Sequence, residues 1–101
     1  MASKLSPTEL YLIAVGENVR RYRLKRGYTL EALGLDIGLD KGNMHKIEAG
    51  KNVTVLTLLK ISSFLEVDPQ KLIETDVKLS MDHMENFVAG KKRQKRRAKR
   101  K

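Results

Sequence analysis

Apolar residues recur every three or four positions over most of residues 8–76, and no stretch alternates between polar and apolar residues as a half-buried strand does. This periodicity predicts a first helix at residues 7–26, two short helices within residues 29–50, a fourth at 55–65 and a short fifth at 69–73. Capping residues precede three of these segments, as Ser6, Thr54 and Asp68, and proline follows two of the caps. We therefore expect a single compact all-α domain of five helices.

Residues 29–50, TLEALGLDIGLDKGNMHKIEAG, are typical of two short helices joined at a sharp turn. Gly38 stands at the corner, where the end of a helix often needs a positive φ that glycine adopts readily. Asp40 follows as a candidate N-cap, and Gly34 lacks a Cβ where the two helices would cross. The apolar positions expected to close the helices on each other are Leu33, Ile37, Leu39, Met44 and Ile47. This layout is that of a helix-turn-helix, whose second helix enters the DNA major groove.

The remaining helices supply the rest of the expected core. The first helix would turn Leu10, Ile13, Val19 and Tyr22 inward, with Leu12 and Val15 as further candidates. Most other apolar residues fall in the fourth and fifth helices, as Val55, Leu58, Leu59, Ile61, Phe64, Leu65, Leu72 and Ile73. Gly16 interrupts the first helix, and it marks either a kink or the join between a leader and the domain proper.

Composition excludes several classes of protein. The chain has 101 residues, which leaves room for one domain with a small core, and it contains no cysteine. Neither His45 nor His83 has a neighbouring metal ligand, and no catalytic grouping or phosphate-binding glycine loop is visible, so we expect no metal, no cofactor and no enzymatic activity. The longest apolar run, residues 10–15, is far shorter than the roughly 18 residues of a membrane helix. With no secretory signal visible, a cytoplasmic protein is expected.

Positive charge is concentrated at the end of the chain. Residues 91–101, KKRQKRRAKRK, hold nine of the 21 basic residues and no acidic one. The remaining 90 positions carry 12 basic and 12 acidic residues and are therefore neutral. We expect this tail to be disordered, because like charges repel and it has no large apolar side chain to bury. Residues 1–7 are expected to form a flexible N-terminus. It would bind a polyanion by displacing counterions, or alternatively serve only solubility.

With these motifs placed, residues 16–75 resemble the lambda-repressor-like (Xre-type) helix-turn-helix proteins, a group of mainly bacterial and phage DNA-binding regulators. The matching segments are GENVRRYRLKRGYTLEAL, GLDKGNMHKIEAGK and TVLTLLKISSFLEVDPQKL. The resemblance implies a lambda-repressor-like DNA-binding domain. It also implies a largely buried ion pair between Arg23 and Glu48, which the sequence alone would leave as surface charges.

Three positions depart from the pattern of that family. Leu30 stands where many relatives have a glutamine that touches the DNA backbone, so one expected contact is missing. Gly34 replaces the commoner alanine, and Glu66 replaces the usual glycine after the fourth helix. None of the three removes the motif.

The third helix supplies the candidate DNA contacts. A period of 3.6 residues turns Met44, Ile47 and Glu48 inward and leaves the polar positions outside. The candidate base contacts are Lys41, Gly42, Asn43 and Lys46. The candidate phosphate contacts are Thr29, Lys51, Asn52 and Thr54. His45 is either a further contact or an exposed bystander, and the alternative for the whole face is an ordinary solvated helix surface.

These features favour a sequence-specific transcriptional regulator, more often a repressor in this family. Because one such motif reads about half a site, we expect a homodimer on an inverted-repeat operator of double-stranded DNA. Its interface would combine the fifth helix with residues 77–90, where Met81, Met84, Phe87 and Val88 form an apolar stripe, unless that segment packs on its own domain or contacts a protein partner. The alternatives are an antitoxin that regulates its own operon and a tail-driven, non-specific nucleic-acid-binding protein. A location on the nucleoid follows from either form of DNA binding.

Overall fold

The computed structural model describes residues 5–79, which form five helices and no strand. The helices are α1 (Pro7–Lys25), α2 (Leu30–Ile37), α3 (Lys41–Glu48), α4 (Val55–Leu65) and α5 (Pro69–Leu72). Each lies where the apolar periodicity places it, so the expected all-α fold is confirmed. The basic tail at 91–101 and most of the segment at 77–90 lie outside the described residues. None of the five helices is long and apolar enough to cross a membrane.

Local capping explains where the helices begin. The carboxylate of Asp40 accepts a hydrogen bond from the Asn43 amide at 2.7 Å, and the Thr54 hydroxyl accepts one from the Thr57 amide at 3.0 Å. At the start of α1, Ser6 and Glu9 form a reciprocal capping box. Each cap satisfies a backbone donor that has no partner inside its helix, so these boundaries are fixed by the local sequence.

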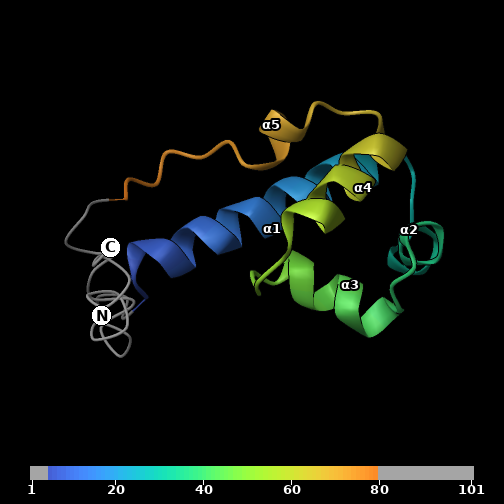
Figure 1. Ribbon diagram of the computed structural model, residues 1–101, viewed down its shortest axis with the longest axis horizontal. Helices are drawn as coiled ribbons and strands as arrows, with labels where there is room; N and C mark the ends of the chain where they lie inside the picture. Colours follow the sequence, from blue (N-terminus) through green and yellow to red (C-terminus); the bar gives the residue numbers. More distant parts are fainter. Residues whose placement is uncertain (1–4, 80–101) are drawn as a thin grey trace, which may run out of the picture.

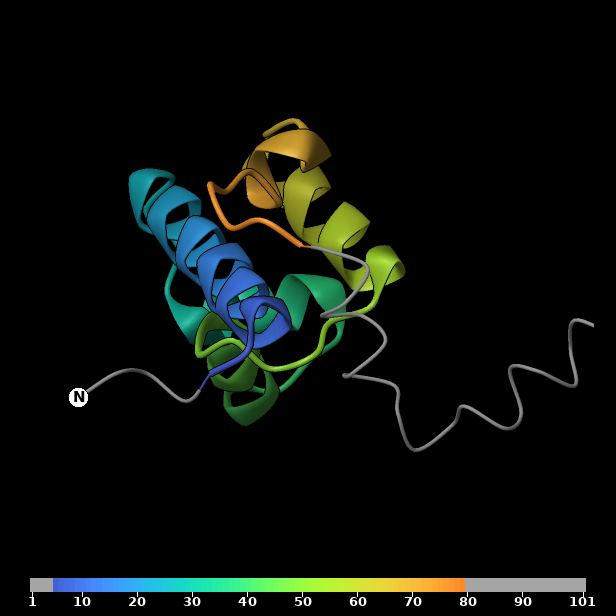
Figure 2. The ribbon, with the colours of Figure 1, turned by 90° about the vertical axis from the view of Figure 1, so that its left-hand side faces the viewer.

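The helices pack around α1, the longest element (Figure 1). Helices α3 and α5 contact different sides of α1, and α2 and α4 lie near the C-terminal end of α1. After α5 the chain runs back along α1, as both views of the ribbon show (Figures 1 and 2). The Asn18 side-chain amide holds this return by donating to the carbonyls of Leu72 and Glu74 at 3.0 and 2.8 Å. Every helix contributes to one core, made of Val19, Leu33, Ile37, Met44, Ile47, Ile61, Leu65 and Leu72.

Gly16 marks neither a kink nor a join, because α1 runs unbroken through it. A Cβ atom placed at Gly16 would lie 2.6 Å from the carbonyl oxygens of both Ile47 and Glu48. The glycine therefore lets the backbone of α1 contact the last turn of α3. At Gly34 an added Cβ would overlap the Leu39 carbonyl oxygen, as expected for a close crossing of α2 with the turn that follows it.

Several apolar residues expected in the core are exposed instead. On α4, Val55 is 71% exposed, Leu59 46% and Phe64 42%. On α1, Leu10 is 38% exposed. A helix that packs against neighbours on one side buries only one stripe, and α4 uses Ile61 and Leu65 for that contact. The number of apolar residues on α4 exceeds what a single stripe accommodates.

Glu66 ends α4 in a left-handed conformation, with φ 57° and ψ 47°, and it is the only non-glycine residue with positive φ in residues 5–79. Its carboxylate pairs with Arg26 at 2.7 Å, but both side chains are largely solvent-exposed. A β-carbon in this conformation costs on the order of 1 kcal/mol, whereas an exposed ion pair contributes less than about 1 kcal/mol.

Replacing Glu66 with glycine is therefore expected to give a protein more stable than the Glu66→Ala variant by about 1 kcal/mol. Both changes remove the ion pair with Arg26, so the difference between them reports the backbone strain less the additional conformational entropy that glycine loses on folding. Urea unfolding followed by circular dichroism measures it. Equal free energies of unfolding for the two variants would show that the left-handed conformation costs no more than the additional entropy that glycine loses on folding.

Candidate DNA-binding surface

Helix α3 presents one face to the core and the other to solvent. The left-handed conformation of Gly38, with φ 83°, ends α2 and allows the turn that aims α3 outward. Met44 is fully buried and Ile47 is 7% exposed, and both pack against the core. The opposite face is exposed and consists of Lys41, Gly42, Asn43, His45, Lys46 and Ala49. All four candidate base contacts thus lie together on the solvent side of one short helix.

Gly42 lies on this face with little around it. A Cβ at Gly42 would approach only the Asp40 carboxylate oxygen, at an ordinary contact distance of 3.5 Å. The protein therefore has no internal requirement for glycine at this position. The lack of a side chain leaves the backbone of α3 open to an approaching ligand.

The candidate phosphate contacts fall into two groups. Thr29 is the N-cap of α2, and its hydroxyl accepts from the Ala32 amide at 3.0 Å. Lys51, Asn52 and Thr54 lie beyond the other end of the motif, where all three are exposed. This second group is held by the turn after α3, in which the Lys51 amide donates to the Lys46 carbonyl at 3.0 Å. The Thr54 hydroxyl caps α4, so its role in the fold is established independently of any ligand.

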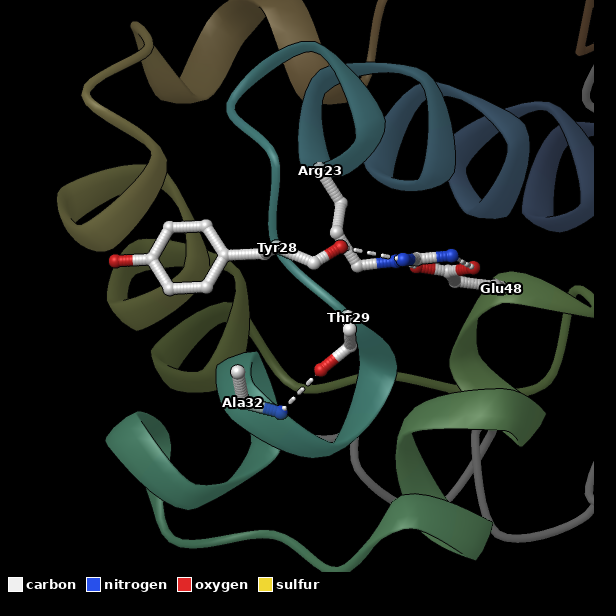
Figure 3. A network of polar contacts seen from close by, with 5 residues as sticks. All are labelled: Arg23, Tyr28, Thr29, Ala32 and Glu48. Carbon is white, nitrogen blue, oxygen red and sulfur yellow. Dashed lines mark hydrogen bonds and ion pairs between the residues drawn. The ribbon is translucent and has the colours of Figure 1, made fainter.

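The structure brings Arg23 and Glu48 together as a two-pronged ion pair (Figure 3). Arg23 Nε donates to Glu48 Oε2 at 2.6 Å, and Nη2 donates to Oε1 at 3.1 Å. Its remaining nitrogen, Nη1, donates to the Tyr28 carbonyl at 2.7 Å. The two side chains are only 8% and 6% exposed. One guanidinium thereby joins α1, the α1–α2 loop and the C-terminal turn of α3.

Arg20 also belongs to this surface, although the sequence did not predict it. Arg20 lines a surface hollow of about 350 Å³ with Leu30, His45 and Ala49, beside the Arg23–Glu48 pair. Leu30 is partly buried and packs against the core, which explains an apolar residue at this position. Nothing in the local sequence distinguishes Arg20 from its neighbours on α1, because its place beside α3 depends on how the helices pack. No group of three or more potential metal ligands occurs in the part of the chain that the structure describes.

Replacing Glu48 with alanine is expected to lower the free energy of unfolding by about 3 kcal/mol, because Arg23 would remain buried without its counter-charge. Arg23→Lys should also destabilise the fold, since an ammonium cannot supply the planar three-nitrogen pattern. The control is Arg26→Ala, which breaks an exposed ion pair and should lower the free energy by about 1 kcal/mol or less. Urea unfolding at pH 7 measures all three, and similar decreases for Glu48→Ala and Arg26→Ala would contradict the importance of the buried pair.

Comparison with known proteins places this geometry in context. Over 64 residues the chain is 34% identical to the HTH-type transcriptional regulator SlrR of Bacillus subtilis (strain 168), a match that covers 61% of the chain and 42% of SlrR. The chain thus spans less than half the length of that relative.

Solved structures of regulatory proteins also superpose on this chain. The restriction-modification controller protein C.AhdI from Aeromonas hydrophila superposes with a TM-score of 0.58 and 31% identity, over 60% of this chain and 94% of that protein. SinR of Bacillus subtilis, the master regulator for biofilm formation, was solved in complex with DNA. It superposes with a TM-score of 0.56 and 29% identity, over 59% of this chain and 98% of the SinR chain. Residues 19–72, which run from α1 to the end of α5, match the helix-turn-helix family HTH_3, and the chain belongs to that family.

Proposed function

We propose that the protein is a sequence-specific transcriptional regulator that places α3 in the DNA major groove and acts as a repressor from an inverted-repeat operator. The observation that carries the proposal is that α3 exposes one polar face to solvent while Met44 and Ile47 on its other face are buried in the core. The family and the relatives are DNA-binding regulators and not enzymes, which supports a binding function.

The exposed side chains suit the edges of base pairs. The amide of Asn43 can form two hydrogen bonds with adenine, and the ammonium groups of Lys41 and Lys46 can donate to guanine O6 and N7. Because Gly42 has no side chain, the backbone of α3 can approach the bases closely at this position. The amides at the start of α2, next to Thr29, and the exposed Lys51 would fix the helix on the phosphate backbone without reading sequence.

A homodimer is part of the proposal because a single α3 covers only about half a site. Most of the segment at 77–90, which the sequence assigns to the interface, lies outside the described residues. Leu72 of α5 is fully buried, and Ile73, which directly follows α5, is 41% exposed rather than in the core as expected. The larger apolar surface is on the first turns of α4, where Val55, Leu56 and Leu59 are 71%, 62% and 46% exposed. This α4 surface supports association next to the loop that carries Lys51.

The basic residues at 91–101 support a second candidate function. Nine cations in eleven positions would bind any nucleic acid through counterion release, with little preference for sequence. In that case the protein coats nucleic acid, and α3 contributes little. Both functions would place the protein on the nucleoid in the cytoplasm.

Selection of bound sites from a random duplex pool separates the two functions. We expect the full chain and a version ending at Gly90 to enrich the same inverted repeat, because base contacts come from α3 and the tail adds only sequence-independent affinity. The version ending at Gly90 keeps every described residue. Enrichment of no site by that version, together with salt-sensitive binding of any duplex by the full chain, would favour the coating function.

Gly42→Ala gives a sharper test of the α3 face. Alanine is expected to raise the free energy of unfolding by about 0.5–1 kcal/mol, because it favours the helix and meets no clash within the protein. The same change should weaken binding to the enriched site, because the methyl group would stand between α3 and the bases. Anisotropy titration and urea unfolding measure the two effects. Unchanged or tighter binding by the more stable variant would contradict a close approach at Gly42.

A further inference from the structure

Arg20 is an exposed arginine on α1 whose side chain is not engaged. It takes part in none of the ion pairs, hydrogen bonds or ring contacts found within residues 5–79. Glu48, the acidic residue that lines the hollow beside α3, is held by the two-pronged pair with Arg23. Glu17 lines another hollow with Arg20, but the two form none of the ion pairs found within residues 5–79. Because Arg23 satisfies both oxygens of Glu48, Arg20 keeps a positive charge free to bind an external anion.

Two surface hollows meet at Ala49, an exposed residue at the end of α3, and Arg20 lines one of them. One hollow is lined by Ala49, Gly50, Lys51 and Asn52 together with the N-terminal half of α1. The other is lined by Ala49, His45, Leu30 and Arg20. A cationic side chain thus lines each hollow, Lys51 the first and Arg20 the second. Only Lys51 of these two is assigned to a phosphate from the sequence.

A helix in the major groove lies between two phosphate backbones, and each backbone needs a partner on its own side of the helix. Lys51, which lines the first hollow, would contact the phosphate backbone on that side of α3. On the other side the sequence assigns only Thr29, which carries no charge. The geometry therefore leaves one backbone without a cation unless Arg20 provides it.

We propose that Arg20 binds a phosphodiester of double-stranded DNA in the hollow that it forms with Leu30, His45 and Ala49. The guanidinium supplies the charge, and its planar donors suit phosphate oxygens. The first amides of α2 lie beside Leu30 and have no acceptor within their own helix, so they can share the same phosphate. This inference rests on the proposed function, because it assumes that α3 enters the groove.

The test compares matched glutamine variants of the full chain on a single duplex that carries the enriched site. Arg20→Gln is the test, Lys51→Gln the positive control, and Arg21→Gln the negative control. Arg21 is the adjacent arginine on α1, but its side chain donates to Asn18 and lies over the Tyr22 ring, and it does not line the hollow beside α3. The measured quantity is the slope of log affinity against log salt concentration, whose magnitude decreases by about 0.9 for each phosphate that the protein no longer neutralises.

Arg20→Gln is expected to weaken binding about tenfold at 0.1 M salt and to reduce the slope by about 0.9, as Lys51→Gln does, while Arg20→Lys keeps the slope. The thermal unfolding midpoint should change little, because Arg20 forms no ion pair and no ring contact within residues 5–79. A purely structural effect would lower the active fraction equally at all salt concentrations and leave the slope unchanged.

Two other outcomes overturn the inference in different ways. If Lys51→Gln reduces the slope and Arg20→Gln behaves like Arg21→Gln, Arg20 does not contact phosphate, whereas the proposed function stands. If all three glutamine variants bind like the unaltered chain, the helix-turn-helix surface does not carry DNA binding. The proposed function then fails, and the role of Arg20 fails with it.

Discussion

The position of helix α3 depends on the buried pair between Arg23 and Glu48. Helix α3 has only eight residues, and a helix of that length is unstable in water unless other parts of the protein hold it. Its first turn is fixed locally by the Asp40 cap, but its last turn depends on α1. The ion pair and the crossing at Gly16 act on that same turn, one through side chains and one through backbone contact.

A buried ion pair is not an efficient source of stability, because removing two charges from water offsets much of their attraction. The main contribution of this pair is to fix the relative positions of the segments that it joins. Three directed hydrogen bonds from one rigid guanidinium fix the distance between α1, the Tyr28 carbonyl and α3 more narrowly than apolar packing would. The proposed contacts of α3 with base edges require such placement, since a small displacement of α3 would misalign every donor on it. The same pair neutralises Glu48, whose negative charge would otherwise oppose the DNA binding that is proposed for this surface.

Locally encoded features were predictable from the sequence. Helix starts at Ser6, Asp40 and Thr54 were found because a cap and its partner lie three residues apart. The outward face of α3 was found because helical periodicity separates Met44 and Ile47 from the polar positions. The resemblance to a known family was needed for the pairing of Arg23 with Glu48, which lie 25 positions apart and show no local sign of contact.

Features that depend on packing between helices were not predictable. The apolar residues of α4 look equivalent in the sequence, but only those facing α1, α2 and α5 are buried, so Val55 and Leu59 were wrongly assigned to the core. Gly16 was misread for the same reason, since the backbone that it admits belongs to residues 47 and 48. Arg20 was missed because its neighbours across the hollow come from α2 and α3. Each of these errors concerns the surface or the crossing of helices, where the partner is distant in the sequence. The same property gives those positions functional interest, because a surface assembled from several helices can change its contacts to DNA or to another protein without altering the caps and core that specify the fold.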